Sequence, residues 1–349
     1  MTKLLSLSRV LPAEWERQDA IVVAWPHRDT DWHYMLSQAQ QCFKNVAAAI
    51  VKEMRLIVVS PDAEAVRRQL SDLENGDNII YVECETNDTW ARDFGPISVV
   101  DDGKHLMLDF KFNAWGMKFP SCHDNLICHH MESNGIFNAT WINCQDFVLE
   151  GGSIESDGQG TILTTSQCLL SPNRNGWLSK EGIEEVLNSR LGAKKVLWLD
   201  NGELTGDDTD AHIDTLARLA PGNTILYVKC DDPSDEQYEP LRLMEQELAA
   251  MTNAQDEKFN LVPLPCPSPI HDEDGQRLPA TYANFLITNR QVLVPVYGQP
   301  ENDKKALDTI GKVFDTRTVV GIDCNALIQQ HGSLHCITMQ IPENYLKTT

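Results

Sequence analysis

The chain has 349 residues, of which 42% are hydrophobic and 23% are charged, a composition typical of a globular protein and too apolar for a disordered one. Its 29 Lys and Arg residues against 51 Asp and Glu residues give a net charge of −22, which disfavours nucleic-acid and anionic-membrane partners. We expect neither a membrane span nor a signal peptide, because no apolar run is long enough. The ten scattered cysteines favour reduced thiols and a cytoplasmic location.

Five segments have the apolar spacing of an amphipathic helix, the second of them only weakly. They are residues 36–54, 122–133, 179–191, 236–252 and 302–313. A short apolar run follows each helix and predicts a strand. These runs are residues 56–59, 140–142, 196–199, 260–262 and 319–322.

Most of the helices are also preceded by two apolar runs that a turn joins. The pairs are 97–100 with 106–110, 151–155 with 161–165, 213–219 with 224–229, and 282–287 with 292–296. The repeating unit is therefore strand–turn–strand–helix–strand, with a period of roughly 60 residues. Uneven repeat lengths leave two alternatives open, a ring of six modules and a generic α+β arrangement.

Four units are complete, and the fifth is divided between the two ends of the chain. Its helix follows the apolar run 20–25, whereas its first strand is the run 335–341. We predict that residues 20–25 pair with the strand around 337–341 and close a ring. The whole chain, residues 1–349, would then be one α/β domain whose first strands point at a common axis.

A polar side chain interrupts the apolar residues at or beside the start of each unit. These residues are Asp93, Glu150, His212 with Asp214, Asn284 and Cys336. Units arranged around one axis would bring three carboxylates, an imidazole and a thiol together. Buried charges are unfavourable unless they are paired, so this cluster predicts a ligand or mutual compensation.

The chemistry open to such a cluster is limited. Two carboxylates can each accept a pair of hydrogen bonds from a planar guanidinium. A thiolate can attack the central carbon without an oxyanion hole, because the delocalised cation is itself the electrophile. A histidine can protonate the departing ammonia and later activate water. His212 and Asp214 are two residues apart on an expected strand, so we expect both on one face.

Four segments resemble the signature segments of the agmatine deiminase family, also called the Porphyromonas-type peptidylarginine deiminase family of guanidine-modifying enzymes. They are TWARDFGP (89–96), LEGGSI (149–154), DAHIDTLAR (210–218) and GSLHCIT (332–338). The resemblance runs from Trp15 to the last of these segments. It implies a five-bladed α/β propeller (the pentein fold) with pseudo-fivefold symmetry. It also implies hydrolysis of agmatine to N-carbamoylputrescine and ammonia, a step of putrescine and polyamine biosynthesis.

The resemblance implies a role for each matching residue. Cys336 matches the nucleophile that forms an amidino-cysteine intermediate, and His212 matches the general acid and base. Asp93 and Asp214 match the carboxylates that hold the guanidinium. Glu150 matches a carboxylate that contacts the guanidinium or steadies the histidine.

Further residues match the surroundings of that site. Asp208, four positions before the histidine, matches an aspartate of the family. Trp90 and Trp115 resemble the aromatic walls of the substrate slot, and Gly151 falls among the substrate contacts. The chain departs from the family pattern at 94–96, 115–117 and 332–336, which leaves the binding of the far end of the substrate open.

Each of these residues also has a plain structural interpretation. Asp93 could pair with the neighbouring Arg92, and Glu150 could cap the glycine-rich turn. Trp90 and Trp115 could be core aromatics. Taken with the motifs around them, the residues favour the catalytic interpretation.

We expect no metal and no cofactor. Cys122, His123, Cys128, His129 and His130 lack the paired spacing of a zinc site. The glycines at 151–152 and 157–160 lack the lysine of a phosphate loop, so nucleotide binding is not expected.

The expected partner is a small cationic guanidine, and whether the chain forms a homo-oligomer is left open. Two alternatives to agmatine hydrolysis remain. One is deimination of free arginine or peptidyl-arginine with the same chemistry. The other is a ring that binds guanidines without catalysis, although Cys336 and His212 are both present.

Overall fold

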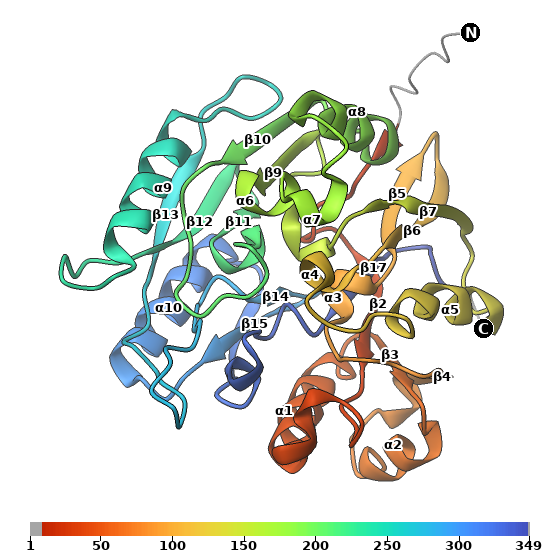
Figure 1. Cartoon of the computed structure of the whole chain (residues 1–349). Helices are drawn as coiled ribbons and strands as arrows, with labels where there is room; N and C mark the ends of the chain where they lie inside the picture. The colour runs from red at the N-terminus through yellow and green to blue at the C-terminus, as the bar shows by residue number, and fades with distance from the viewer. Residues whose placement is uncertain (1–8, 348–349) are drawn as a thin grey trace, which may run out of the picture.

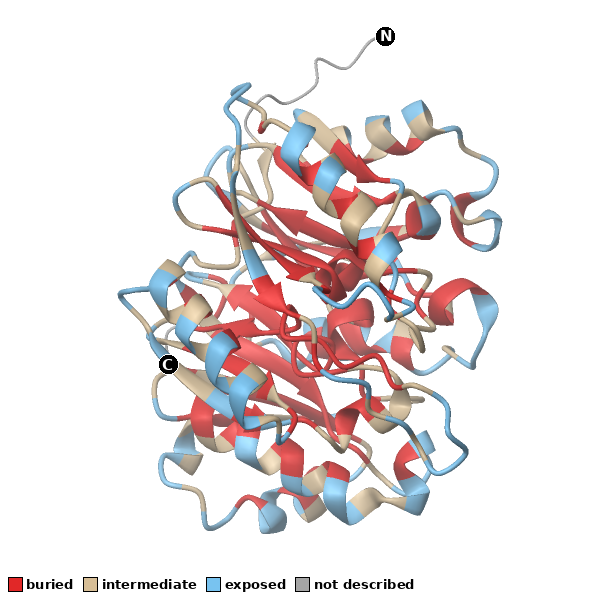
Figure 2. Ribbon diagram, turned by 90° about the vertical axis from the view of Figure 1, so that its left-hand side faces the viewer, coloured by how far each residue is buried: buried red, intermediate tan, exposed pale blue. Residues whose placement is uncertain are grey.

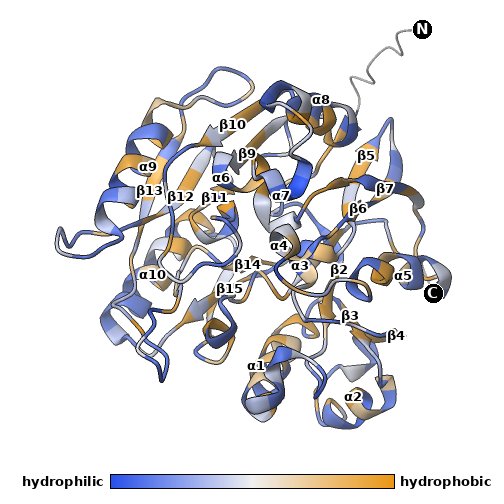
Figure 3. Ribbon diagram, viewed as in Figure 1, coloured by the Kyte–Doolittle hydropathy of each residue, from blue (hydrophilic) through white to orange (hydrophobic). Residues whose placement is uncertain are grey.

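The structure, a computed structural model, describes residues 9–347 and is an α/β fold (Figure 1). Small sheets lie in the interior and the long helices lie at the periphery, with their exposed residues facing outward (Figure 2). Colouring by hydropathy shows the same division, with apolar strands inside and polar helix faces outside (Figure 3). In residues 9–347, no helix is both long enough and apolar enough to cross a bilayer.

Seventeen strands in the described residues form five sheets. One sheet has the order β1 (Arg9–Val10), β5 (Ile97–Asp101), β6 (Lys104–Lys111), β7 (Thr140–Val148). Three sheets have three strands each: β8 (Ile154–Ser156), β9 (Thr161–Thr165), β10 (Lys195–Leu199); β11 (Ala217–Ala220), β12 (Thr224–Lys229), β13 (Asn260–Pro265); and β14 (Leu286–Ile287), β15 (Gln291–Val296), β16 (Thr318–Asp323). The last has the order β17 (Met339–Pro342), β2 (Gln18–Ala24), β3 (Arg55–Ser60), β4 (Ile79–Glu83).

The same pairing recurs in all five sheets. A first strand runs antiparallel to a second, and the second runs parallel to a third. A helix connects the second strand to the third, because a parallel pair needs a crossover connection. These helices are α1 (Leu36–Ile50), α5 (Ile127–Asn134), α8 (Lys180–Leu191), α9 (Tyr238–Ala250) and α10 (Pro300–Val313). The predicted unit of strand, strand, helix and strand is therefore confirmed.

The predicted pairing between the two ends of the chain is also confirmed. Strand β17 runs antiparallel to β2, with Met339 opposite Val22 and Ile341 opposite Ala20. The side chains of Val22, Ala20 and Ile341 are almost completely buried. The pairing therefore places the segment before β17, which contains Cys336, inside the molecule.

The first strands are shorter than the sequence predicts, and this is the main correction to the expected elements. We expected a strand over 213–219, but β11 begins only at Ala217, and Ile213–Thr215 is a 3₁₀ helix (η5). His212 and Asp214 therefore lie on a turn and not on a strand. The hydroxyl and the N–H of Thr215 both donate to the carbonyl of His212, at 2.8 and 3.3 Å, which closes this turn.

Similar turns precede the other first strands. Gly151–Ser153 is a 3₁₀ helix (η4) before β8, and Ala91–Phe94 is a short helix (α3) before β5. Strand β14 has only two residues, and the segment around Cys336 is a turn that ends before Met339. The apolar content of these segments reflects burial around the site and not strand pairing.

Several elements fall outside the predicted units. They are α2 (Ala63–Gln69), α4 (Ala114–Met117), α6 (Ser166–Leu169), α7 (Pro172–Asn175) and strand β4. Helix α8 begins where the sequence indicates, because the hydroxyl of Ser179 accepts from the N–H of Gly182 at 3.3 Å. The same helix ends at Gly192, whose left-handed backbone terminates it.

Candidate active site

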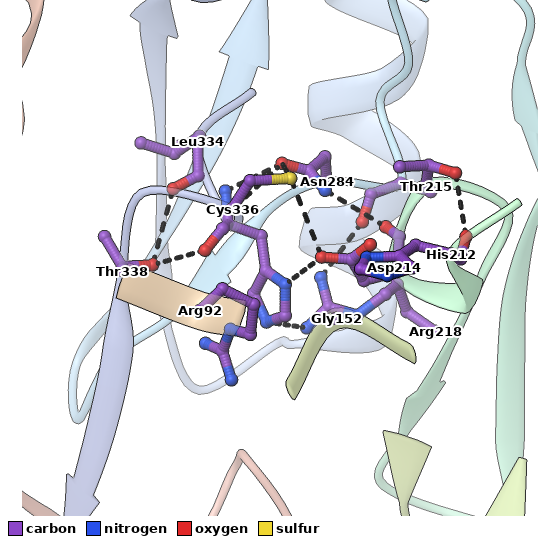
Figure 4. A network of polar contacts seen from close by, with 12 residues as sticks. Arg92, Gly152, His212, Asp214, Thr215, Arg218, Asn284, Leu334, Cys336 and Thr338 are labelled. Atoms are coloured by element: carbon purple, nitrogen blue, oxygen red, sulfur yellow. Dashed lines mark hydrogen bonds and ion pairs between the residues drawn. The ribbon is translucent and has the colours of Figure 1, made fainter. Parts of the chain in front are cut away.

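The polar residues predicted to converge meet around Gly152 (Figure 4). A Cβ atom on this glycine would lie 2.6 Å from His212 Nδ1, 2.8 Å from Asp93 Oδ1 and 3.2 Å from Asp214 Oδ2. The N–H of Gly152 donates to Asp93 Oδ1 at 3.0 Å. A side chain at this position would therefore displace the three groups that the turns bring together.

Cys336 lies at the edge of the same cluster. Its Sγ is 3.8 Å from Asp214 Oδ2 and 3.3 Å from Asn284 Oδ1 (Figure 4). The Asn284 oxygen also accepts from the backbone N–H groups of His335 at 2.8 Å and Cys336 at 3.3 Å. Asn284 therefore holds the turn that carries the thiol.

The environment of Cys336 favours the neutral thiol. Burial raises the pKa of Cys336 well above its usual value, and the nearby carboxylates of Asp214 and Asp93 raise it further. A cation placed between the sulfur and these carboxylates would oppose both carboxylate effects. The thiol can therefore become a nucleophile when a cation enters.

The two carboxylates differ in their ionisation. Burial raises the pKa of Asp93 to about 6, even though His212 and the indole of Trp115 lower it. Burial acts on Asp214 in the same direction, but the hydrogen bond from His335 holds the pKa of Asp214 below its ordinary value. Asp214 therefore stays ionised in conditions where part of Asp93 is protonated.

Two buried polar atoms of the cluster have no hydrogen-bond partner among residues 9–347. They are Asp214 Oδ1 and His212 Nε2. An unpaired buried polar atom is costly, so both atoms indicate a place for a polar ligand or water. A guanidinium N–H would satisfy Asp214 Oδ1.

His212 is almost completely buried and lies near several anionic groups. Burial alone would lower its pKa, but Asp93, Cys168 and Glu150 raise the pKa of His212 well above its usual value. Its Nδ1 lies 3.6 Å from Asp93 Oδ1. His212 is therefore an imidazolium near neutral pH, able to donate a proton to a leaving group.

Glu150 lies on the far side of His212 and is paired with Arg174. The Nε of Arg174 contacts the two Glu150 oxygens at 2.8 and 3.1 Å, and both side chains are fully buried. Ligand atoms of Glu150, Cys168 and His212 lie within 4.8 Å of one another, a spacing that a metal ion could use. Because Arg174 already compensates the charge of Glu150, the absence of a metal from the reaction stays our prediction.

Two tryptophans border the cavity beside the cluster. The indole N–H of Trp115 donates to Asp93 Oδ2 at 2.9 Å, so this residue also orients a carboxylate. Its backbone is left-handed, as is that of Ala114. The ring of Trp90 leaves no room for a side chain at Gly332, where a Cβ would lie 2.2 Å from it.

A cavity of about 30 Å³ leads to Cys336, Asp93 and the two tryptophans. Its outer lining includes Asp31, Asp88, Asp208, Phe119 and His331. Burial raises the pKa of Asp88 to about 8, and it raises that of Asp208 to a smaller extent. Asp88 is therefore mostly protonated at neutral pH, and a cation bound beside it would favour its ionised form.

Most of the predicted site residues lie in this cluster or line its cavity, but Gly151 does not. A Cβ on Gly151 would meet the carbonyl of Arg92 and the side chain of Met339, on the side away from His212. Gly151 lines a separate cavity, whereas the N–H of Gly152 faces the cluster, and the substrate contact expected of Gly151 stays a prediction.

Sequence reasoning missed several residues that the structure adds to the site. Arg174 and Cys168 lie beside Glu150 and His212, whereas Glu14 and His335 lie behind Asp214. The position of His335 next to the candidate nucleophile was a usable signal. Arg174 offered none, because it is a single cation in an irregular segment.

The chain is similar to known proteins over most of its length. A sequence model of the family described as Porphyromonas-type peptidyl-arginine deiminase matches residues 10–342. An agmatine deiminase from Medicago truncatula is 34% identical over 363 residues, which cover 95% of this chain and 96% of that protein.

Solved structures agree with this match over nearly the whole chain. A C. jejuni agmatine deiminase with substrate bound is 36% identical, with a TM-score of 0.89 and 97% of each chain covered. A crystal structure from Porphyromonas gingivalis, provisionally described as an arginine deiminase, is 48% identical, with a TM-score of 0.93. That match covers 97% of this chain and 100% of the other.

Proposed function

The chain belongs to the Porphyromonas-type peptidyl-arginine deiminase family, and from that membership we propose that it hydrolyses agmatine to N-carbamoylputrescine and ammonia. One observation carries the proposal. The buried carboxylates of Asp93 and Asp214 adjoin the thiol of Cys336 and the imidazole of His212. This set of groups fits a planar guanidinium cation and an attack on its carbon.

The first half of the reaction follows from these contacts. The guanidinium binds between Asp93 and Asp214, and its charge offsets the two carboxylates that hold the pKa of Cys336 high. As the cation enters, the thiol loses its proton to solvent, because His212 already carries one, and the sulfur forms a bond to the guanidinium carbon. His212 then donates its proton to the departing nitrogen, the carbon–nitrogen bond breaks and ammonia leaves.

The second half regenerates the enzyme. His212, now neutral, takes a proton from water as the oxygen attacks the amidino carbon. The carbon–sulfur bond breaks, the hydroxyl proton of the adduct returns to the Cys336 sulfur, and the product carries a neutral ureido group. Glu150 steadies His212 in both halves, and the ion pair with Arg174 supports its position beside the imidazole.

The fold that supports this site is, in our proposal, a five-bladed α/β propeller with pseudo-fivefold symmetry. The identical strand order of the five sheets and the pairing of β17 with β2 support it. We propose that residues 1–349 form this single catalytic domain and that it works in the cytoplasm. All ten cysteines are unpaired, which fits a reducing compartment.

The remaining residues concern the far end of the substrate. We propose that Asp208 attracts the distal ammonium of agmatine and that Trp90 and Trp115 flank its alkyl chain, since all three line the cavity. Free arginine would instead require a cation for its carboxylate. Among the described residues that line the cavity, His331 is the basic one. Its Nδ1 lies 2.7 Å from the carbonyl of Gly206, so this nitrogen already has a partner.

A substrate panel tests the proposed function. Ammonia release and ureido colour formation are measured with agmatine, arginine, a methylated arginine and a peptide that contains arginine. We expect turnover of agmatine by the wild type and none by Cys336→Ala. If the wild type prefers arginine or the peptide, that guanidine and not agmatine is the substrate. If it turns over none of the guanidines, the protein binds guanidines without catalysis.

A further inference from the structure

Behind Asp214, on the side away from the cavity that leads to Cys336, a short series of hydrogen bonds leads toward the N-terminal segment. His335 Nδ1 lies 2.7 Å from Asp214 Oδ2, and His335 Nε2 lies 2.8 Å from Glu14 Oε1. We propose that Glu14, acting through His335, positions Asp214 to hold the guanidinium. This role for Glu14 rests on the proposed function.

The imidazole of His335 is held from both ends. An ionised carboxylate only accepts hydrogen bonds, so Nδ1 carries a proton and donates it to Asp214. The other nitrogen faces the Glu14 carboxylate, which only accepts, and the guanidinium of Arg218 at 3.0 Å, which only donates. Burial, Arg218 and Arg92 lower the pKa of His335, so Nε2 of the neutral ring accepts from Arg218, and Glu14 holds that guanidinium at 2.6 Å. The histidine is completely buried and cannot turn without breaking these contacts.

Glu14 is fixed by more than one partner. Its carboxylate contacts Arg92 at 3.0 Å and Arg218 at 2.6 Å, and it accepts from the side-chain amide of Gln340 at 2.9 Å. Three elements that are distant in sequence therefore converge on one carboxylate. Such a fixed group can determine where the ring of His335 lies.

The arrangement leaves one oxygen of Asp214 for a ligand. Oδ2 is occupied by His335, whereas Oδ1 is buried without a partner. If the His335 ring turned, the carboxylate of Asp214 would turn with it and redirect Oδ1. The positions of Oδ1 and of the guanidinium carbon relative to the sulfur therefore depend on Glu14.

A nearby carboxylate provides a matched control. Glu155 also binds Arg218, at 2.5 Å, and it accepts from the N–H of Leu219 at 3.0 Å. It makes no hydrogen bond to His335 among the bonds of the described residues. Loss of Glu155 thus removes a buried carboxylate from the same arginine without removing the contact to the histidine.

The first test compares Glu14→Gln with Glu155→Gln by steady-state kinetics on agmatine and by thermal unfolding. We expect Glu14→Gln to lower kcat/KM at least tenfold, with kcat falling as well as KM rising, and Glu155→Gln to lower kcat/KM less than threefold. An equal loss in both variants, or a Glu14→Gln value within twofold of wild type, would overturn the proposal.

The second test asks whether Glu14 acts through Asp214. In an Asp214→Asn background, adding Glu14→Gln should change kcat/KM less than twofold, because the group that it positions is already impaired. If kcat/KM of the double variant fell by the product of the two single-variant losses, Glu14 would not act through Asp214.

Chemical rescue gives a third readout that a purely structural role would not produce. A cavity of about 70 Å³ borders Glu14, Arg92 and Gln340, and the Glu14 side chain is 18% exposed. In Glu14→Ala, formate should restore kcat/KM at least fivefold with saturation, whereas formamide should not. No recovery with formate, or equal recovery with formamide, would contradict the role of the carboxylate.

The outcomes separate this inference from the proposed function. If the wild type does not turn over agmatine, the proposed function fails, and the same comparison is made on whichever guanidine is turned over. If agmatine is turned over and Glu14→Gln is as active as wild type, the inference alone fails. If Glu14→Ala does not fold, the Glu14→Gln kinetics decide the inference.

Discussion

The two sides of the turn at Gly151–Gly152 differ in how their charges are balanced. On the side of Gly151, Arg92 and Arg218 are paired with the carboxylate of Glu14. On the side of Gly152, Asp93 and Asp214 adjoin each other with no arginine or lysine in contact with either among the described ion pairs. The first side balances its charges between arginines and carboxylates, whereas the two carboxylates of the second side have only histidines as basic neighbours. The fold thus uses one layer of turns to separate a structural network from a reactive site.

The largest expected effect comes from removing the nucleophile on the reactive side. Cys336→Ser should fold normally, because the change is small, yet lower kcat by several orders of magnitude, since serine is a far weaker nucleophile near neutral pH. Turnover of agmatine and circular dichroism measure the two properties. As a control, a haloacetamidine should label Cys336 selectively in the wild type, and uniform labelling of the ten cysteines would argue against activation by a bound cation.

The next largest effect is expected from the two carboxylates that hold the guanidinium. Asp93→Asn and Asp214→Asn each keep the shape but place an amide donor opposite substrate N–H groups. We expect each variant to lose about 3 to 5 kcal/mol of transition-state binding, or about 10² to 10⁴ in kcat/KM. The loss should be similar for every guanidine that the enzyme accepts. Near-wild-type rates in either variant would mean that the guanidinium lies elsewhere.

The pH dependence sharpens the comparison between the two carboxylates. Asp93 must be ionised to bind a cation, and burial raises its pKa to about 6. Below that pH, kcat/KM should fall about tenfold per unit, because this ratio reports on the free enzyme. A bound guanidinium holds the carboxylate ionised, so kcat should fall at a lower pH. If the fall of kcat/KM at low pH is unchanged in Asp93→Asn, the titrating group is not Asp93.

The smallest effect concerns the outer part of the cavity. Asp208→Asn should raise KM for agmatine several-fold while leaving KM for a guanidine that lacks a distal ammonium nearly unchanged, because Asp208 lines the cavity but is not one of the two carboxylates that act on the thiol. Matched kinetics on the two substrates measure the difference. Equal effects on both would place Asp208 outside the substrate contacts.

Periodicity predicts the fold well where side chains only pack. The run 224–229 coincides with β12, and the run 161–165 coincides with β9. In both runs the side chains serve only to pack the core, so the whole run forms a strand. The same reasoning fails at 213–219 and 282–287. There, buried residues supply polar groups or surround them, and short turns replace the first part of each strand.

The site is predictable to the extent that its residues lie in motifs. Cys336, His212, Asp93 and Asp214 are brought together as the motifs indicate. Glu14 could not be found in this way, because its partners are distant in sequence and its contacts depend on how whole sheets pack. A substrate contact of Gly151 stays a prediction, because adjacent glycines face opposite sides of the turn and composition does not determine which one faces the cluster.

The pairing of β17 with β2 has a consequence for the synthesis of the protein. Strand β2 is synthesised early, and one of its edges stays unpaired until β17, far along the chain, has been synthesised. An open strand edge invites pairing with other chains, so a nascent or prematurely terminated product is prone to aggregate. The same final segment carries the thiol. A chain that stops before this segment therefore lacks the nucleophile and keeps the open strand edge, and activity requires that β17 and the segment before it have been synthesised.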